Sequence, residues 1–262
     1  QTAPATGPLL TLLALGNFIV GMGAFVVIGI VTPIAEGLSV SASSAGIILT
    51  AYAIAYALLS PIGAAVTGTF PRRNVLAGAL ALFCIGSVIS ALSTSVGMLT
   101  ASRILVAFGA ALYTPLSAGV AVAVSPPDQR GRALARVFGG MTAAQVVGVP
   151  AGAWLAYRFG WEATFWVVAA LAALGAPLLF RMIPRDLTFQ ATTVGTVISA
   201  MRDVRLMVAT GFTATIMTAV YIVFTFFGPL IEASVGSNPE TRTLYLVLYA
   251  GADAAYLHTL EI

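Results

Sequence analysis

Residues 98–123 read MLTASRILVAFGAALYTPLSAGVAVA, an apolar stretch in which Arg103 is the only charged side chain. As an α-helix rising about 1.5 Å per residue, this stretch is long enough to cross the roughly 30 Å of hydrocarbon in a bilayer. An unpaired guanidinium at that depth costs at least about 2.5–3.5 kcal/mol. The stretch therefore predicts a membrane-spanning helix, and it raises the question of what compensates the charge of Arg103.

The composition of the whole chain agrees with a membrane protein. Of its 262 residues, 59% are hydrophobic and 8% are charged, and the mean hydropathy is +1.00. Soluble domains carry about 25% charged residues, so a soluble fold is excluded. The net charge of +3 is dispersed along the chain, which excludes the basic patch that nucleic-acid binding requires. A single cysteine, Cys84, and a single histidine, His258, predict neither a metal site nor a cofactor.

Further apolar runs along the chain have the length of a membrane span. Barrel strands would alternate over about ten residues, and these runs do not. Backbone groups in hydrocarbon must pair within their own segment or within a closed barrel. The sequence thus predicts an all-α, multi-pass integral membrane protein that resides in the lipid bilayer. The runs lie at about 9–31, 44–67, 74–92, 98–123, 134–156, 163–181 and 206–230, and an eighth begins near residue 243.

The arginines predict the orientation of the helices, because cytoplasmic loops carry an excess of positive charge. Only Arg158 and Arg242 fall in loops of the opposite side, and Arg103 lies inside a run. We therefore expect a cytoplasmic N-terminus. The loops after the second, fourth and sixth runs hold the other nine arginines, at positions 72, 73, 130, 132, 136, 181, 185, 202 and 205.

A repeated motif suggests that the chain contains parts of two similar halves. Pro33 and Glu36 stand at the outer end of the first run, and Pro229 and Glu232 stand at the same end of the seventh. Two parallel six-helix halves are typical of some secondary transporters. The expected domains are a six-helix N-terminal bundle (1–181), a cytoplasmic inter-bundle loop (182–205), and the truncated start of a second bundle (206–262) with helix 7 and part of helix 8.

The loop SPIGAAVTGTFPRRNVL (60–76) carries a family resemblance. It resembles the signature G-x-x-x-D-R-x-G-R-R between helices 2 and 3 of the major facilitator superfamily, in the form found in bacterial drug and sugar (arabinose-efflux-like) efflux permeases. Gly63, Arg72 and Arg73 match, while Gly68 stands at the acidic position. The resemblance implies a loop that changes its contacts during transport. The alternative is that the two arginines only mark the cytoplasmic side.

The stretch around Arg103 resembles the helix 4 signature of the same family, R-x-x-Q-G-x-G-A-A, with Arg103 and residues 109–111 matching. The family's arginine takes part in proton coupling, so the resemblance implies that role for Arg103. Independently, Ala110, Thr114 and Ser117 follow Arg103 at helical spacing, which predicts a face turned toward other helices or a wet cavity. The alternative is an arginine that snorkels to the outer interface.

Small residues recur at every fourth position in GGMTAAQVVGVPAGAWLA (139–156), as expected where helices pack closely in lipid. Pro150 favours a kink in this run. Gly148, Pro150 and Gly152 resemble part of the family's helix 5 antiporter signature, which implies a role in gating. Close packing alone is the alternative, and the two are compatible.

Few polar side chains lie at membrane depth, and these are the candidates for lining a transport path. Tyrosines also anchor helices at the membrane interface, whereas buried amides need polar partners. Related efflux permeases often carry a glutamate in the middle of helix 1, where this chain has Ala24, and no acidic residue lies mid-membrane in the first six runs. The candidates are Asn17, Tyr52, Tyr56, Arg103, Tyr113 and Gln145.

The resemblance implies a secondary active transporter of the bacterial inner (plasma) membrane, exporting drugs, sugars or metabolites by proton-coupled alternating access. Its partners are then a small-molecule substrate and protons, and the proton gradient is its energy source. We expect no enzymatic activity and no catalytic residue, because the zinc-protease motif and a buried serine–histidine pair are absent. The alternative is a non-transporting fragment of such an exporter. The substrate, the proton-coupling residue and the oligomeric state stay open.

Overall fold

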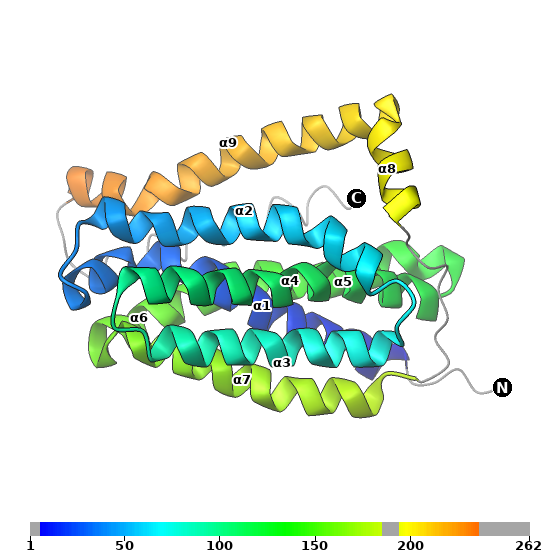
Figure 1. Ribbon diagram of the computed structural model, residues 1–262, viewed down its shortest axis with the longest axis horizontal. Coiled ribbons are helices and arrows are strands. Elements are labelled where there is room, and N and C mark those ends of the chain that lie inside the picture. Colours follow the sequence, from blue (N-terminus) through cyan, green and yellow to red (C-terminus); the bar gives the residue numbers. More distant parts are fainter. Residues whose placement is uncertain (1–5, 185–193, 236–262) are drawn as a thin grey trace.

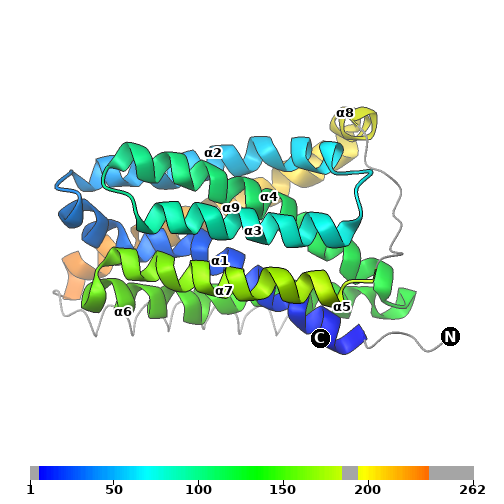
Figure 2. The same cartoon turned by 60° about the horizontal axis from the view of Figure 1, so that its bottom comes forward.

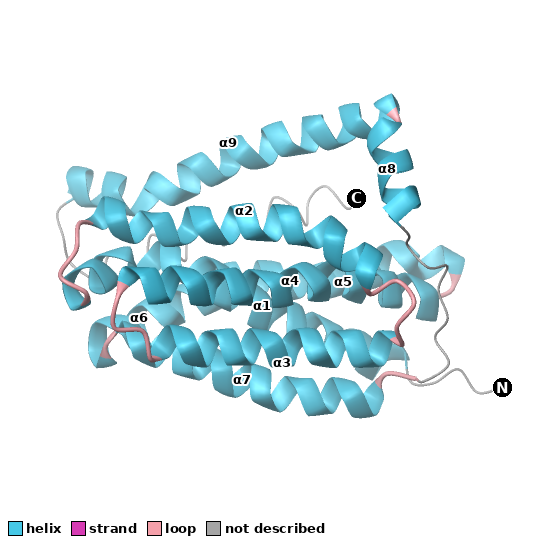
Figure 3. Ribbon diagram, viewed as in Figure 1, coloured by secondary structure: helices cyan, strands magenta, loops and turns pink. Residues whose placement is uncertain are grey.

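A computed structural model of the chain describes residues 6–184 and 194–235. Within these two ranges every regular element is a helix (Figure 3). The expected all-α fold is therefore confirmed. The expected eighth run, Arg242 and His258 lie outside the described residues.

The first four helices agree with the apolar runs, and local sequence explains their ends. The hydroxyls of Ser41 and Ser95 accept hydrogen bonds from the backbone N–H groups of Ser44 and Met98, the third residues of the helices that follow, as N-cap residues do. The first helix bends at Ile30 (φ −123°, ψ 15°), because Pro33 supplies no N–H and its ring crowds the preceding turn. The helices are α1 (Thr6–Gly37), α2 (Ala42–Val66), α3 (Arg72–Ala91) and α4 (Val96–Val124).

The fifth run, predicted at about 134–156, forms a continuous helical segment that a π-helical turn divides in two. The N–H of Val149 bonds the carbonyl of Ala144, five residues back. Pro150 follows directly and has no N–H to continue the α-helical pattern, so the wider turn takes up the interruption. A short 3₁₀ turn, η1 (Pro127–Gln129), leads into α5 (Arg130–Ala143), the π-turn η2 (Ala144–Gly148) and α6 (Val149–Phe159).

The chain reverses between the fifth and sixth spans at the single residue Gly160. Its φ of +91° is a conformation that glycine adopts without steric cost.

Part of the segment 182–205, which the sequence assigns to an inter-bundle loop, forms a short helix. The remaining helices are α7 (Trp161–Met182), α8 (Val194–Arg202) and α9 (Val204–Val235).

Among the described helices, five are long and apolar enough to cross a membrane: α1, α2, α3, α4 and α7. The fifth apolar run is not among them, because the π-turn divides it into the shorter helices α5 and α6. The described part of α9 contributes a further apolar helical stretch, Val204–Val220.

The helices pack side by side into a bundle in which α1 contacts α2, α4, α5, α6 and α7 (Figures 1 and 2). Helix α3 packs against both α4 and α7. Small residues permit close approach: a Cβ atom at Gly109 would lie 2.6 Å from the carbonyl oxygen of Ala79, and one at Gly140 would overlap the carbonyl of Ala14. Close backbone contact of this kind is how helices associate in lipid.

Figure 1 shows that the arginine-rich connections gather at one end of the bundle, together with the start of α1. This end holds the α2–α3 loop, the turn η1 and the end of α7. Helix α8 also lies at this end, where it contacts α2. The alternation of loops between two ends, expected from the positions of the arginines, is therefore present in the fold.

Candidate functional site

Arg103 is enclosed by side chains from several helices. It lies in α4 with 0% of its surface exposed, and its Nη2 donates a hydrogen bond to the carbonyl oxygen of Ala24 in α1 at 3.3 Å. The ring centre of Tyr52 in α2 lies 4.7 Å from the guanidinium carbon, and that of Phe165 in α7 lies 5.8 Å from it. A snorkelling arginine leaves its guanidinium at the surface, so Arg103 does not follow that alternative.

The contacts of Arg103 offset only part of the cost of burying its charge. A hydrogen bond to a charged group contributes about 1.5–3 kcal/mol, and each cation–π contact about 0.5–2 kcal/mol. The Nε and Nη1 atoms are buried and have no hydrogen-bond partner among the described residues. The acidic residues whose side chains the structure describes stand at helix ends or in turns, at Glu36, Asp128, Glu162 and Asp203.

A second polar group lies between α1 and α4. Asn17 Nδ2 donates a hydrogen bond to Ser117 Oγ at 2.9 Å, with both side chains fully buried. Asn17 Oδ1 is buried and accepts no hydrogen bond from the described residues. On the adjacent α2, the hydroxyl of Tyr56 faces Thr114. A buried amide whose oxygen is unpaired is destabilising by itself, which marks Asn17 as a group open to a further polar partner.

The tyrosines of α2 connect these two groups. The rings of Tyr52 and Tyr56 stack with their centres 6.2 Å apart and their planes at 26°. Tyr52 contacts Arg103, and Tyr56 faces Thr114. The structure thus brings four of the six predicted cavity residues, Asn17, Tyr52, Tyr56 and Arg103, along the region where α1, α2 and α4 meet.

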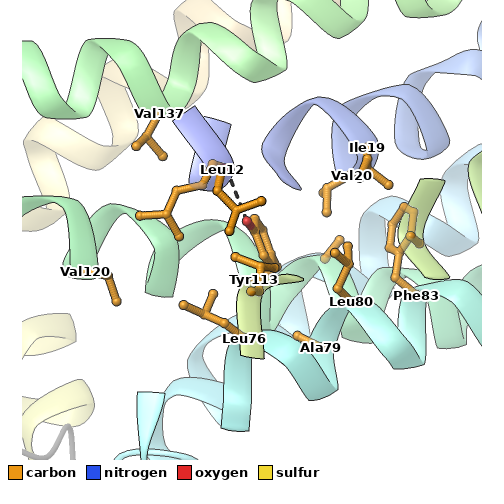
Figure 4. Packing of buried hydrophobic residues seen from close by; sticks show 14 of the residues in the cluster. Leu12, Ile19, Val20, Leu76, Ala79, Leu80, Phe83, Tyr113, Val120 and Val137 are labelled. Atoms are coloured by element: carbon orange, nitrogen blue, oxygen red, sulfur yellow. Dashed lines mark hydrogen bonds between the residues drawn. The ribbon is translucent and has the colours of Figure 1, made fainter. Parts of the chain in front are cut away.

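Tyr113 lies deeper in the packing of the bundle than Tyr52 and Tyr56, which are half-buried. It is fully buried within an apolar cluster that includes Leu76, Leu80 and Phe83 (Figure 4). Its hydroxyl donates a hydrogen bond to the carbonyl oxygen of Leu13 at 3.2 Å, and its ring occupies the space that a side chain at position 16 would fill. These contacts make Tyr113 part of the packing between α1 and α4.

Gln145 lies on a different helical segment from Arg103. It is half-buried inside the π-turn η2, which packs against α1. Gln145 is therefore part of the segment in which the described fifth span changes from α-helical to π-helical hydrogen bonding. Its assignment to the transport path stays a prediction.

The α2–α3 loop is fixed by its first arginine. Arg72 is 7% exposed, and it donates hydrogen bonds to the carbonyl oxygens of Thr67 at 3.2 Å and Gly68 at 3.0 Å. Those carbonyls follow the end of α2, where a cation is favourable. Arg73 lies with its guanidinium carbon 3.8 Å from the ring centre of Phe180 in α7. The loop signature therefore links the ends of α2, α3 and α7.

The glycines of the loop signature and of the helix 5 signature lie at helix contacts. A Cβ atom at Gly63 would come 2.5 Å from Leu112 in α4. A Cβ atom at Gly148 would lie 3.2 Å from Met22, and one at Gly152 would overlap Val26; both partners lie in α1. Close packing is thus present at these positions, and gating by the Gly148–Pro150–Gly152 segment stays a prediction.

Phe165 is the contact of Arg103 that reasoning from sequence missed. It stands in a run of apolar residues, FWVVAALAAL (165–174), and nothing in its spacing distinguishes it from lipid-facing neighbours. The carbonyl of Ala24 is equally hidden in the sequence, because every residue has one. The spacing within α4 did predict a buried face around Arg103, since Ala110, Thr114 and Ser117 are all buried on the same face as Arg103.

Comparison with known proteins agrees with this architecture. The family model of the Major Facilitator Superfamily matches residues 13–255. The chain is 32% identical over 250 residues to a chloramphenicol resistance protein of Streptomyces lividans, covering 94% of this chain and 64% of that protein. It is 30% identical over 241 residues to the inner membrane transport protein YdhP of Escherichia coli, covering 92% of this chain and 62% of YdhP. It therefore spans less than two thirds of the length of either relative.

Solved structures show the same fold. A bacterial homologue of the human lysosomal transporter Spinster, in an inward-facing and unoccupied conformation, superposes with a TM-score of 0.78 at 20% identity, over 97% of this chain and 61% of that one. The xylose transporter XylE of E. coli, in a partially occluded inward-open conformation, gives a TM-score of 0.68 at 17% identity, over 98% of this chain and 73% of that one. With a family model that matches most of its length and a bundle of this form, the chain belongs to the major facilitator superfamily.

Proposed function

We propose that this chain works in a secondary active transporter that exports small organic molecules from bacterial cells. In this proposal it spans the inner membrane with a cytoplasmic N-terminus, and alternating access driven by the proton gradient moves the substrate outward. The family supports transport in general, and the similarity to a chloramphenicol resistance protein supports export. The gathering of the arginines at the end of the bundle that holds the start of α1 supports the orientation.

The observation that carries the proposal is the polar region inside the bundle. Arg103 and Asn17 are fully buried in otherwise apolar helices, and each has polar atoms without a hydrogen-bond partner among the described residues. Polar groups of this kind inside a membrane mark the path of a substrate or ion, because they are costly for stability alone. An arginine does not lose its proton in proteins, so Arg103 acts here through the group that it binds.

Drug accumulation in living cells tests this function. The chain, expressed from its native gene in a strain that lacks its own drug exporters, should lower the steady-state content of radiolabelled chloramphenicol. A protonophore should restore the content to that of cells with empty vector. Equal accumulation with and without the protein, over a panel that includes neutral drugs, sugars and organic acids, would contradict export.

A further inference from the structure

We propose that Arg103 binds the carboxylate of a small aromatic monoanion, so that organic acids are substrates of this transporter. The inference rests on the proposed function and specifies the substrate class of the same site. It starts from the two buried guanidinium nitrogens that have no hydrogen-bond partner among the described residues, Nε and Nη1.

The guanidinium has unused donors for a two-point contact. Its five N–H groups form two planar forks, one from Nε and Nη2 and one from Nη1 and Nη2. The carbonyl of Ala24 takes a single hydrogen bond from Nη2, which carries two hydrogens. Whichever hydrogen it takes, one complete fork stays open. A planar carboxylate fits such a fork with two parallel hydrogen bonds.

The charge balance favours an anion over a neutral partner. No acidic side chain of the described residues forms an ion pair with Arg103, which contacts a backbone carbonyl and two aromatic rings. The nearest acidic residue in the sequence of α7, Glu162, directs its carboxylate to the helix end beside Gly160. A buried charge without a counter-ion is strongly destabilising, so a bound carboxylate supplies the charge that the described helices lack.

The surroundings favour an anion with an aromatic or apolar body. The rings of Tyr52 and Phe165 flank the guanidinium, and Val106 and Ala107 next to it in α4 are fully buried. A small, strongly hydrated inorganic anion would lose its water here and find few donors to replace it. An aromatic carboxylate loses less hydration, because its ring packs against apolar side chains.

Of the two rings that flank the guanidinium, only that of Tyr52 belongs to a partly exposed side chain. Arg103 is fully enclosed, whereas Tyr52 is half-buried and belongs to α2, of whose most apolar stretch only 22% is buried. We therefore expect a carboxylate to approach the guanidinium from the side of α2, past the Tyr52 ring. Removing the ring by Tyr52→Ala should raise the rate at which a carboxylate reaches Arg103.

Binding to the purified protein in detergent tests the inference without requiring transport. Radiolabelled benzoate at neutral pH, measured by equilibrium dialysis, should bind saturably to the full chain. Unlabelled benzoate should compete, and benzamide, which has the same shape without the charge, should compete at least about tenfold less well. This comparison uses only the wild-type protein and does not depend on how a variant folds.

Two substitutions then locate the site. Arg103→Gln should weaken benzoate binding about tenfold or more, and Arg103→Lys, which keeps the charge but loses the fork, should fall between it and wild type. Arg158→Gln is the matched control, because Arg158 is exposed at the end of α6, and it should leave binding unchanged. Size-exclusion profiles of the variants verify that they fold.

The outcomes distinguish this inference from the proposed function. Absent benzoate binding, equal competition by benzamide, or unchanged binding in a folded Arg103→Gln variant would each overturn the carboxylate site. If chloramphenicol export is nevertheless observed, the transporter function stands and only the substrate class is wrong. Benzoate binding without any export in cells would retain the site and contradict the function.

Discussion

Three arginines of this chain differ in how deeply they are buried and in what they contact. Arg103 lies in the centre of the bundle against a carbonyl and two rings, Arg72 bonds the carbonyls at the end of α2, and Arg73 lies over Phe180. All three are the same residue type in a chain that contains no lysine. Before the structure is known, only their positions in the sequence distinguish them.

The two loop arginines should contribute unequally to stability. Arg72→Ala removes charge-assisted hydrogen bonds from a nearly buried side chain, which costs about 1.5–3 kcal/mol. Arg73→Ala removes a single cation–π contact, worth about 0.5–1 kcal/mol at a partly exposed site. Thermal unfolding of the purified variants in detergent should show the larger loss of melting temperature for Arg72→Ala. Equal losses would mean that both arginines act mainly as topology signals.

Residue-level reasoning from the sequence identified the buried arginine but not its partners. The spacing of Ala110, Thr114 and Ser117 correctly predicted a face turned inward, and all three are buried. The rings of Phe165 and Tyr52 come from helices far away in the sequence, so their contact with Arg103 depends on how the bundle packs. Tyr113 packs in an apolar cluster against which Tyr52 and Tyr56 also pack, and its assignment to the transport path stays a prediction.

At the scale of helices, hydropathy is sufficient to predict where the spans lie. It does not predict the local hydrogen-bond pattern within them. The ends of the apolar runs agree with those of α2, α3, α4 and α7 to about two residues, whereas α1 (Thr6–Gly37) extends beyond its run of 9–31 at both ends. The π-turn in the fifth span was not predicted, because a proline predicts an interruption without specifying whether the helix kinks or widens. The helix α8 was also missed, since its polar neighbours are typical of a loop.

Pro150 allows the gating role of the fifth span to be tested. Pro150→Ala restores an N–H next to the π-turn and favours regular α-helix. It should therefore leave the melting temperature unchanged or raise it. If the π-turn is needed for conformational change, the initial rate of export should fall several-fold. Pro177→Ala in α7, where the proline is exposed, is the control and should leave the rate unaltered. A Pro150→Ala variant with the wild-type rate would leave close packing as the role of this segment.

At the scale of the whole molecule, the fold places the basic loops at one end, and the remaining question is which side of the membrane that end faces. Loop charge predicts the cytoplasm. The bundle supports the alternation of loops, because the arginine-rich connections and the start of α1 lie together in Figure 1.

Cysteine labelling in intact cells tests this orientation. After Cys84→Ser removes the single native cysteine, Thr69→Cys and Thr94→Cys provide a matched pair of exposed positions in loops at opposite ends of the bundle. A membrane-impermeant maleimide should label Thr94→Cys in intact cells and Thr69→Cys only after the cells are opened. The reverse pattern would place the N-terminus outside and contradict the predicted orientation.

The central claim is that Arg103 serves transport and is not required to insert or fold the bundle. The most direct measurement is export by the Arg103→Ala variant of a substrate that the wild-type protein exports, alongside the amount of variant in the membrane. We expect export reduced to the level of empty vector, with wild-type amounts of protein in the membrane fraction and an unchanged size-exclusion profile. Wild-type export by a normally inserted Arg103→Ala variant would contradict it, and the guanidinium would then be a buried charge that only the packing of α1, α2, α4 and α7 tolerates.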